Sequence, residues 1–331
     1  MNKKTVKDID VAGKRVLMRV DFNVPLRDGK VNDDTRITAA LPTIQHVLDQ
    51  GGSLVLMSHL GRPKGKVNPE MSLAPVATVL SERVGRPVQF APDCVGDDVT
   101  ALAAALQAGE ILLLENLRFH AEEEGKAKVP EGASAEEAAA LKADMKQRQA
   151  VFAEQLAALG DVYVNDAFGT AHRAHASVSV AAAHFENRAA GFLLEKEIEY
   201  LGGALADPQR PFVAVLGGAK ISGKIDVITS LLDKVDTLLI GGGMAYTFFK
   251  ARGEAIGNSL LEEDKIPLAL QILEQAEAAG VKLLLPVDSV VADAFSAEAN
   301  TRVVGEGAIE DGWEGLDIGP ETCKLFAAEV A

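Results

Sequence analysis

Short apolar runs alternate with longer amphipathic segments along most of the chain. Apolar, β-branched runs that end at glycine or polar residues predict strands, and such strands are typical of the buried, parallel kind. The predicted strands cover residues 14–20, 53–57, 111–114, 162–164, 212–216, 237–240 and 282–286. Apolar residues at helical spacing predict helices at 35–48, 73–84, 99–106, 151–159, 193–201, 224–232, 245–252, 261–279 and from 321 onward. This alternation of strands and helices predicts an α/β fold.

Two other stretches carry weaker patterns. Residues 121–150 are rich in Ala, Glu and Lys and predict an exposed helix or loop. Residues 313–320 predict a turn-rich loop. Among the predicted strands, the run at 212–216 is of the kind that is buried on both faces.

The amphipathic segment 193–201, followed by two glycines, separates two sets of predicted strands. A chain of 331 residues is long enough for two domains of ordinary size, each with its own core. We therefore predict two Rossmann-like three-layer α/β/α domains with parallel sheets, at residues 1–185 and 203–331, joined by a hinge helix at 186–202. The final helix reaches Ala331 with neither a glycine cap nor a closing strand, so we expect the second domain to be incomplete.

Composition narrows the class of protein. The net charge of -15 argues against a nucleic-acid or membrane-surface partner held by general electrostatics. No secretory signal is predicted, and no stretch approaches the apolar length of a membrane span. Cys94 and Cys323 form no metal-binding or redox spacing, which is typical of a reducing cytoplasm, and each is expected to be a small buried hydrophobe.

Basic side chains follow the predicted strands of the first half of the chain. They are Arg36, His59, Arg62, Arg118, His172 and Arg173. Because the carboxyl ends of parallel strands meet at one edge of a sheet, we expect these side chains to converge there. The planar fork of arginine matches phosphate and carboxylate oxygens, so the expected ligand is a small polyanion. A single arginine in a loop is usually just solvated, so the prediction rests on several of them following strands in the same way.

The segment after the strand at 212–216 is typical of a phosphate-binding loop. Gly217 and Gly218 allow backbone N–H groups to approach an anion, and the helix that begins near Lys224 adds its partial positive end. Lys220 and Lys224 add two full charges. Gly218, Gly223 and Lys224 have most of the Walker spacing, but Ile225 stands where the magnesium-binding Ser or Thr belongs, so this is not a Walker site. A strand-to-helix turn with two solvated lysines is the alternative.

The three glycines at 241–243 lack the spacing of a dinucleotide fingerprint. They could let a flat base approach the backbone, or they could permit close packing of a helix on a strand.

Eight short motifs occur in one order along the chain. They are RVDFNVP at 19–25, DDTRI at 33–37, SHLGRPKG at 58–65, ENLRF at 115–119, NDAFGTAHRAHAS at 165–177, LGGAK at 216–220, GGGMAYTF at 241–248 and GLDIGP at 315–320. Each motif is short, but the set in this order resembles the phosphoglycerate kinase family of bacteria, from the first predicted strand to the last residue.

The resemblance implies a glycolytic kinase that transfers a phosphoryl group reversibly and in line from 1,3-bisphosphoglycerate to ADP. The N-terminal domain would bind 3-phosphoglycerate or 1,3-bisphosphoglycerate, the C-terminal domain would bind ADP or ATP with Mg²⁺, and a hinge would close the two. The family resemblance also implies a cytoplasmic monomer with no nucleic-acid or membrane partner.

Site residues follow from the matched motifs. In the first domain, Asp21 and Asn23 would bind the hydroxyl and carboxyl end of the substrate, and Arg36 would reach the carboxyl end and the transferring phosphoryl group. The substrate's 3-phosphate would be held by Arg62, Arg118 and Arg173, with His59 and His172 nearby. Leu60 and Gly61 are two further residues expected to bind the substrate. In the second domain, Lys220 and Lys224 would bind the nucleotide phosphates and the transferring group. The glycines expected to line the nucleotide pocket are Gly217, Gly218, Gly242 and Gly315.

The chain departs from the family at its end. The resemblance implies a further strand, a ribose-binding glutamate and a glycine-rich segment whose aspartate binds magnesium, and none of these follows Ala331. We therefore assign no magnesium ligand in this chain. An inactive or weakly active fragment that binds anions or nucleotides is the alternative function.

The expected chemistry suits these residue types. A carboxylate is stable as a leaving group and is ionised as a nucleophile at neutral pH, so neither a general acid nor a general base is required. Positioning and charge stabilisation remain, and arginine, lysine and backbone N–H groups supply both.

Two other classes of protein share parts of this pattern. A Rossmann-type NAD-dependent dehydrogenase would explain the glycines after the strands, but the fingerprint spacing and its acidic partner are missing. A non-catalytic anion-binding module would explain the basic residues alone.

Overall fold

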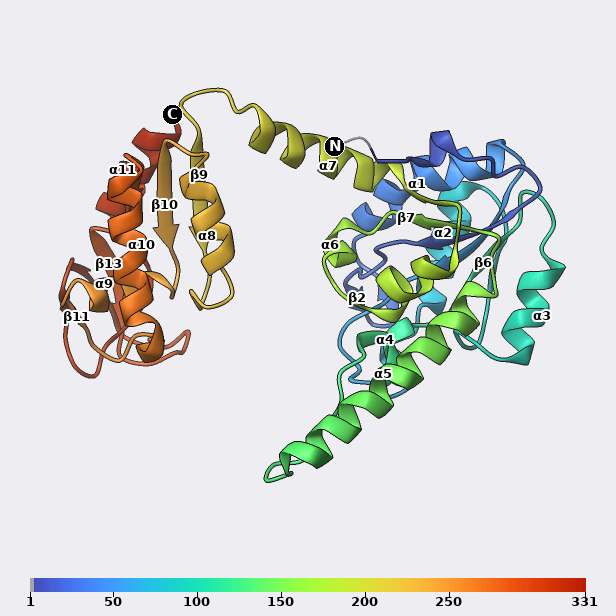
Figure 1. Cartoon of the computed structure of the whole chain (residues 1–331), viewed down its shortest axis with the longest axis horizontal. Helices are drawn as coiled ribbons and strands as arrows, with labels where there is room; N and C mark the ends of the chain where they lie inside the picture. The colour runs from blue at the N-terminus through green and yellow to red at the C-terminus, as the bar shows by residue number, and fades with distance from the viewer. Residues whose placement is uncertain (1–2) are drawn as a thin grey trace. The chain divides into compact units, whose positions relative to one another are not determined.

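The computed structural model describes residues 3–331. The chain divides into two compact units, residues 1–202 and residues 203–331, each of which is described by itself below (Figure 1). The division falls inside helix α7 (Phe192–Ala206), which is the helix predicted at 193–201.

The first unit is built on one parallel sheet of six strands. In spatial order they are β5 (Val88–Phe90), β6 (Ile111–Leu113), β4 (Ser53–Met57), β1 (Arg15–Arg19), β7 (Val162–Asn165) and β8 (Arg188–Ala190). Arg19 at the end of β1 lies beside Met57 of β4 and Asn165 of β7. The chain therefore leaves these three strands at one level, and the loops that follow lie at one edge of the sheet.

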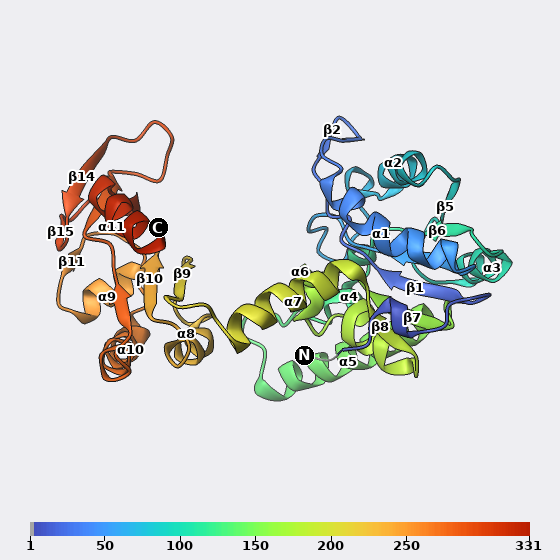
Figure 2. The same cartoon turned by 90° about the horizontal axis from the view of Figure 1, so that it is seen from above.

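Helices cover both faces of this sheet. Helices α1 (Thr35–Asp49) and α2 (Ala74–Val84) pack on the face that carries Val16 and Met18. Helices α3 (Asp97–Ala105) and α5 (Ala135–Ala157) pack on the opposite face, which carries Leu17. Figure 2 shows α1 and α2 on one side of β1 and β7, with α5 on the other. The predicted three-layer arrangement is confirmed for this unit.

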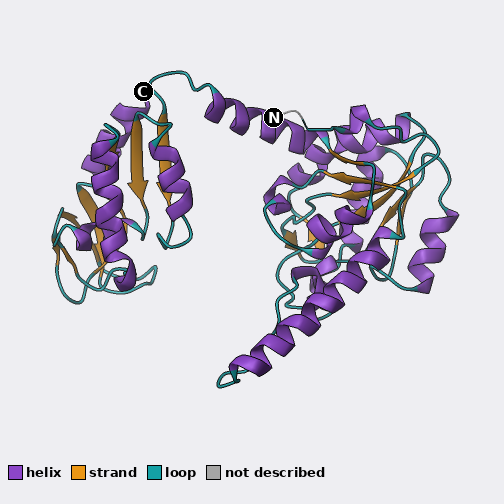
Figure 3. Ribbon diagram, viewed as in Figure 1, coloured by secondary structure: helices purple, strands orange, loops and turns teal. Residues whose placement is uncertain are grey.

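Helix α5 extends beyond the layered part of the unit (Figure 3). The side chains of its first half are mostly exposed, which agrees with the exposed helix or loop predicted for this segment. The other elements of the unit are short. They are η1 (Val6–Asp8), β2 (Leu26–Arg27), β3 (Lys30–Val31), η2 (Pro69–Met71), η3 (Leu117–Phe119), α4 (Ala121–Glu124), α6 (Phe168–Ala171), η4 (Ala176–Val180) and η5 (Ala181–His184).

The second unit contains a parallel sheet of three strands, in the order β12 (Lys282–Leu284), β10 (Thr237–Gly241) and β9 (Val213–Gly217). Its helices are α8 (Ile225–Leu232), α9 (Ala245–Ala251), α10 (Ile266–Ala278) and α11 (Pro320–Val330), and a short turn η6 (Glu263–Lys265) precedes α10. One apolar core includes side chains from α8, α9, α10 and β10.

Two predictions for the second unit are wrong. The strand predicted to be buried on both faces is β9, and Val215 in it is 64% exposed. Among residues 3–331, β9 pairs only with β10, so it is an edge strand, whereas β10 is the buried one. The loop predicted at 313–320 contains strand β16 (Glu314–Ile318).

Strand β16 belongs to an antiparallel sheet that the sequence did not indicate. Its order is β14 (Thr301–Gly305), β13 (Asp288–Ala292) and β16, with an irregularity between Val290 and Val291. A short parallel pair, β11 (Ala255–Ile256) and β15 (Ala308–Ile309), completes the unit. None of the helices described in residues 3–331 has both the length and the apolar character needed to cross a bilayer.

Candidate active site

The loops that follow β1, β4, β6 and β7 surround a cavity of about 760 Å³ in the first unit. Its lining includes Asp21, Asn23, Arg36, His59, Gly61, Arg62, Lys64, Gly65, Arg118, Glu124, Lys126, Lys128, Gly169, Thr170 and Arg173. Five of the six basic side chains predicted to converge at one edge of the sheet line this cavity. The sixth, His172, does not.

Asp21 and Arg36 form an ion pair at this cavity. Arg36 lies in the first turn of α1, and its Nη1 is 2.5 Å from Oδ2 of Asp21, which follows β1. The Arg36 side chain is 50% exposed, so the carboxylate orients the guanidinium without enclosing it. Asn23 accepts a hydrogen bond at Oδ1 from the backbone N–H of Gly61, at 2.9 Å, which joins the loops after β1 and β4.

The loop after β4 is shaped by backbone hydrogen bonds to one buried asparagine. Asn116 accepts from the N–H of Leu60 at 3.2 Å and donates to the carbonyl of Leu60 at 2.7 Å. Gly61 has φ of 62°, and a Cβ at this position would lie 2.9 Å from Sδ of Met71. Glycine is therefore required at a turn that brings the backbone to the cavity wall.

Arg118 binds this loop from the other side. Its Nη1 donates to the carbonyl oxygen of Gly61 at 2.9 Å, and its Nε lies 3.5 Å from Oε1 of Glu124. Burial lowers the pKa of Arg118, and Glu124 opposes that shift. An arginine stays protonated in proteins, so a largely buried positive charge lies in the cavity wall.

His59 contributes no charge to the cavity. Burial lowers the pKa of this imidazole to about 2, and the positive charges of Arg19 and Arg118 lower it further in the same direction. The ring is therefore neutral at physiological pH and can bind an anion only by donating an N–H group.

Two predicted substrate residues do not line the cavity. The side chain of Leu60 is buried in the apolar core, and it is the Leu60 backbone that Asn116 binds. His172 is exposed in the loop after β7, whereas its neighbour Arg173 lines the cavity.

The predicted nucleotide loop joins β9 to α8 in the second unit. Gly217 lies beside Gly241 in the parallel pair of β9 and β10, and the N–H of Met244 donates to the Gly218 carbonyl at 2.8 Å. A Cβ at Gly218 would lie 2.9 Å from Cε of Lys224. The Lys224 side chain thus covers the glycine backbone, and Lys220 in the same loop is exposed.

The other two predicted glycines are constrained by close approach. Gly242 has φ of 69°, and a Cβ there would lie 2.8 Å from the Gly218 backbone nitrogen. A Cβ at Gly315 would overlap the phenolic oxygen of Tyr246, a residue of α9. Gly242 therefore belongs to the loop cluster of Gly217 and Gly218, whereas Gly315 lies in strand β16 beside Val291 and contacts Tyr246 and Ser259.

Comparisons with known proteins agree on one family. The sequence model described as phosphoglycerate kinase matches residues 6–331. The phosphoglycerate kinase of Chloroherpeton thalassium is 58% identical over 330 residues, which are 100% of this chain and 78% of the relative. That of Moorella thermoacetica is also 58% identical with the same coverage.

Solved structures agree with the sequence match. The phosphoglycerate kinase of Coxiella burnetii superposes with a TM-score of 0.74 at 38% identity and covers 100% of this chain and 78% of the other. The Pyrococcus horikoshii structure gives a TM-score of 0.75 at 29% identity, with 99% of this chain and 78% of the other covered.

The chain belongs to the phosphoglycerate kinase family. Phosphoglycerate kinases are phosphotransferases of glycolysis that act between 1,3-bisphosphoglycerate and ADP. The resemblance in the eight motifs is confirmed, and the match does not support the alternatives of an NAD-dependent dehydrogenase or an anion-binding module.

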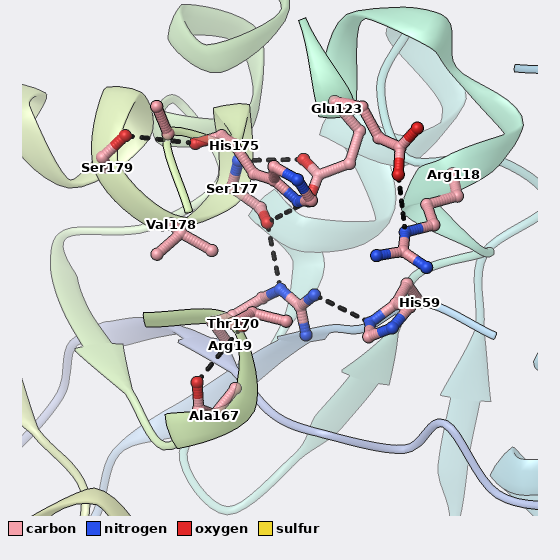
Figure 4. Close-up of polar contacts among 12 residues, drawn as sticks. Arg19, His59, Arg118, Glu123, Ala167, Thr170, His175, Ser177, Val178 and Ser179 are labelled. Carbon is pink, nitrogen blue, oxygen red and sulfur yellow. Dashed lines mark hydrogen bonds and ion pairs between the residues drawn. The ribbon is translucent and has the colours of Figure 1, made fainter. Parts of the chain in front are cut away.

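Several residues around the kinase cavity were not predicted from the sequence. Lys64, Lys126 and Lys128 line it, and Lys64 lies inside a motif that was recognised. Next to His59, four buried polar side chains interact, namely Arg19, Glu123, His175 and Ser177 (Figure 4). Arg19 was the one sequence feature that could have indicated this group. An arginine within an apolar predicted strand is buried, and a buried charge needs a partner.

One group of side chains has metal-binding donors close together. The donors of Asp93, Cys94 and His120 lie within 4.8 Å of one another. The Cys94 thiol is buried, which raises its pKa, and it donates to the carbonyl of Glu115 at 2.9 Å. Mg²⁺ prefers oxygen ligands, and this group offers one carboxylate, so it does not suit the metal expected with the nucleotide.

Proposed function

We propose that the cavity of the first unit binds 3-phosphoglycerate or 1,3-bisphosphoglycerate, and that the loop between β9 and α8 binds the phosphates of ADP or ATP. The observation that carries this proposal is the charge of the cavity within a chain of net charge -15. The charged lining residues are the cations Arg36, Arg62, Lys64, Arg118, Lys126, Lys128 and Arg173 and the anions Asp21 and Glu124. Such an excess of positive charge favours a small polyanion.

Within the cavity we assign the 3-phosphate to Arg62, Arg118 and Arg173, because guanidinium groups bind phosphate oxygens through paired N–H donors. His59 adds a neutral N–H donor. Asp21 and Asn23 would bind the hydroxyl and carboxyl end, since both lie in the loop that follows β1.

Arg36 has a separate role in this proposal. It is half-exposed and paired on one side only with Asp21. It would bind the carboxyl end of the substrate and stabilise the negative charge that spreads over the transferring phosphoryl group.

In the second unit, Lys220 and Lys224 would bind the nucleotide phosphates and the transferring group. Gly217, Gly218 and Gly242 would let the nucleotide approach the backbone, and Gly315 is proposed to line the same pocket. Helix α8 begins at Ile225, directly after Lys224, so its partial positive end favours the phosphates.

Residues 186–202 are proposed to act as a hinge that lets the two units close during turnover. Closure would exclude water, which would otherwise hydrolyse the acyl phosphate. We further propose that the enzyme is a cytoplasmic monomer, with no nucleic-acid or membrane partner, and that Mg²⁺ enters as the nucleotide complex.

A binding experiment tests the assignment of the cavity. Titration of the full chain with 3-phosphoglycerate in a calorimeter should give saturable binding that weakens as the salt concentration rises. Arg62→Ala should weaken this binding by about tenfold or more, the equivalent of about 1.4 kcal/mol for one charge-assisted contact.

The matched control is Arg86→Ala, which removes an exposed arginine outside the cavity lining. Equal affinities for Arg62→Ala, Arg86→Ala and the unaltered chain would contradict the assignment of the cavity. Binding of ATP should be unchanged in both variants, since the proposed nucleotide residues are in the second unit.

A further inference from the structure

A buried relay of four side chains connects Glu123 to His59 in the first unit. The relay consists of Glu123, Ser177, Arg19 and His59, and each of them is at most 5% exposed. Oε1 of Glu123 accepts from the Ser177 hydroxyl at 2.7 Å, Ser177 Oγ accepts from Arg19 Nε at 3.0 Å, and Arg19 Nη2 lies 3.0 Å from His59 Nδ1 (Figure 4). The relay joins α4 and η4 to the ends of β1 and β4.

The donor and the acceptor of each hydrogen bond in this relay follow from the chemistry of its side chains. A carboxylate can only accept, and Glu123 accepts twice from Ser177, from the backbone N–H at 2.9 Å and from the hydroxyl. The hydroxyl has one proton and gives it to Glu123, so Ser177 Oγ is left with lone pairs that accept from Arg19. Arg19 Nη1 also donates to the backbone carbonyl of Val20, and the two bonds together orient the guanidinium toward His59.

The same logic sets the tautomer of His59. Arginine has donors and no acceptor, so His59 Nδ1 must accept from Arg19 Nη2. The neutral ring then carries its proton on Nε2. Because His59 lines the cavity, the relay maintains an imidazole that can donate a hydrogen bond to an anion.

Charge makes the two ionised members of the relay, Arg19 and Glu123, depend on each other. Arg19 and Glu123 are both 0% exposed, and neither lines the cavity. Burial lowers the pKa of Arg19, and the negative charge of Glu123 opposes that shift. Removing one charge would leave the other buried without compensation, which is strongly unfavourable.

We propose that Glu123 is a positioning residue for the phosphoglycerate site, which acts through Ser177 and Arg19 to hold His59 as the Nε2–H tautomer. The inference rests on the proposed function of the cavity. Glu123 does not touch the ligand in this account, so its effect must appear through the orientation and protonation of other side chains.

The test compares two neighbouring glutamates on the same short helix. Glu123→Gln keeps the size of the side chain but replaces one acceptor oxygen by a donor, which opposes one of the two Ser177 donors. We expect 3-phosphoglycerate to bind about tenfold more weakly or worse, the equivalent of about 1.4 kcal/mol, because the hydrogen bond from His59 to the charged ligand is weakened. The control Glu122→Gln alters a carboxylate that pairs with Arg148 outside the cavity and should bind normally.

Nitrogen chemical shifts of His59 give a second measurement on the unliganded chain. The unaltered protein should show the Nε2–H tautomer, and Glu123→Gln should show a mixture of tautomers. A variant that bound 3-phosphoglycerate within twofold of the unaltered chain, or that kept a pure Nε2–H signal, would overturn the inference.

Ser177→Ala covers the case in which Glu123→Gln does not fold. It removes the hydroxyl of the relay and leaves the bond from the backbone N–H to Glu123 intact. It should also weaken 3-phosphoglycerate binding and mix the His59 tautomers, and unchanged values would overturn the inference. If the unaltered chain failed to bind 3-phosphoglycerate, the proposed function would fail, whereas the His59 tautomer would still test the relay.

Discussion

Burial has different consequences for His59 and Arg118 in the same cavity. It lowers the pKa of both, but the imidazole starts from 6.5 and falls to about 2, whereas the guanidinium starts from 12.5. At neutral pH the histidine is therefore uncharged and the arginine is charged. The cavity thus binds anions through arginine and lysine charges, and histidine contributes a hydrogen bond alone.

The first prediction concerns the pH dependence of stability. Because the pKa of His59 is lowered to about 2 on folding, the unfolded chain binds a proton here below about pH 6.5 and the folded chain does not. Protonation of His59 in the unfolded chain therefore lowers the free energy of unfolding as the pH falls below about 6.5. The loss is at most about 1.4 kcal/mol per pH unit. Asparagine at position 59 could still accept from Arg19 and does not titrate.

His59→Asn should therefore flatten the pH dependence of the unfolding free energy of the first unit between about pH 6 and pH 4. Denaturant unfolding followed by far-UV circular dichroism at several pH values measures it. An unchanged slope in the variant would show that His59 is not the group responsible.

The second prediction separates binding from turnover. Arg36→Ala and Lys220→Ala should each reduce kcat for ATP formation by about 100-fold or more, because both residues are assigned to charge that develops in the transition state. The KM values for 1,3-bisphosphoglycerate and ADP should change far less. Steady-state kinetics measure both constants.

Lys234→Ala provides a control for this comparison, since Lys234 is an exposed lysine of the second unit outside the loop between β9 and α8. Near-normal kcat in Arg36→Ala or in Lys220→Ala would refute the role assigned to that residue.

At the scale of elements, buried aspartates hold helix starts in both units. Asp166, at the end of β7, accepts at Oδ1 from the N–H groups of Leu193 and Leu194, at 2.8 Å and 3.1 Å, in the first turn of α7. Burial raises the pKa of Asp166, and these bonds oppose the rise. These bonds join the end of β7, next to the cavity, to the start of α7, the helix in which the two units divide.

In the second unit, Asp288 accepts hydrogen bonds from backbone N–H groups at the start of α11. Its carboxylate accepts from the N–H groups of Glu321 and Thr322, at 3.0 Å and 2.8 Å, and from the Thr322 hydroxyl at 2.5 Å. Burial alone would raise the pKa of Asp288, but these hydrogen bonds dominate and lower it. The interaction therefore stabilises the unit above the ordinary pKa of aspartate and is lost as the pH falls below it.

The third prediction follows from these contacts. Asp288→Ala should destabilise the second unit by about 1–2 kcal/mol, because the start of α11 loses its cap and the Thr322 hydroxyl loses the nearer of its two acceptors. Urea unfolding of the second unit measures the difference. Asp311→Ala, at an exposed position in the turn after β15, is the control and should change the unfolding free energy little, so equal effects of the two substitutions would contradict the capping role.

At the scale of the whole molecule, each unit has its own apolar core. Two core clusters fill the two sides of the sheet in the first unit, and a third lies in the second unit. The only tryptophan of the chain, Trp313, packs against the third core. Its fluorescence therefore reports unfolding of the second unit.

The fourth prediction uses this reporter. ATP at about 100 times its Kd should stabilise the transition seen by Trp313 fluorescence by about 2.7 kcal/mol, because a ligand stabilises the unit that binds it. 3-Phosphoglycerate should shift the circular-dichroism transition of the first unit and leave the fluorescence transition in place. A shift of the fluorescence transition by 3-phosphoglycerate equal to that by ATP would contradict independent unfolding of the units.

Local sequence patterns were sufficient to predict elements whose pattern of apolar residues does not depend on their neighbours in space. The strand predicted at 53–57 matches β4 and the helix predicted at 73–84 matches α2 within one residue, because an apolar run and a periodic face do not depend on the partner that covers them. The convergence of Arg36, Arg62, Arg118 and Arg173 was also predictable, since parallel strands deliver their carboxyl ends to one edge.

Features that depend on which distant segments pack together could not be predicted from the sequence. The edge position of β9, the antiparallel partner of β16 and the exposure of His172 depend on which segments lie beside them, and nothing in their own residues specifies that. Leu60 lies in a recognised motif, yet its side chain joins the core and only its backbone serves the loop.

The residue order by itself determined the alternation of strands and helices, the family and the basic character of the first cavity, because these follow from local periodicity and from the types of residue that follow each strand. Only the tertiary structure placed Glu123 and Ser177 beside Arg19, since a buried charge takes its partner from whichever segment packs against it. The protonated nitrogen of His59 was decided in the same way, because hydrogen-bond donors and acceptors are matched in space and not along the chain.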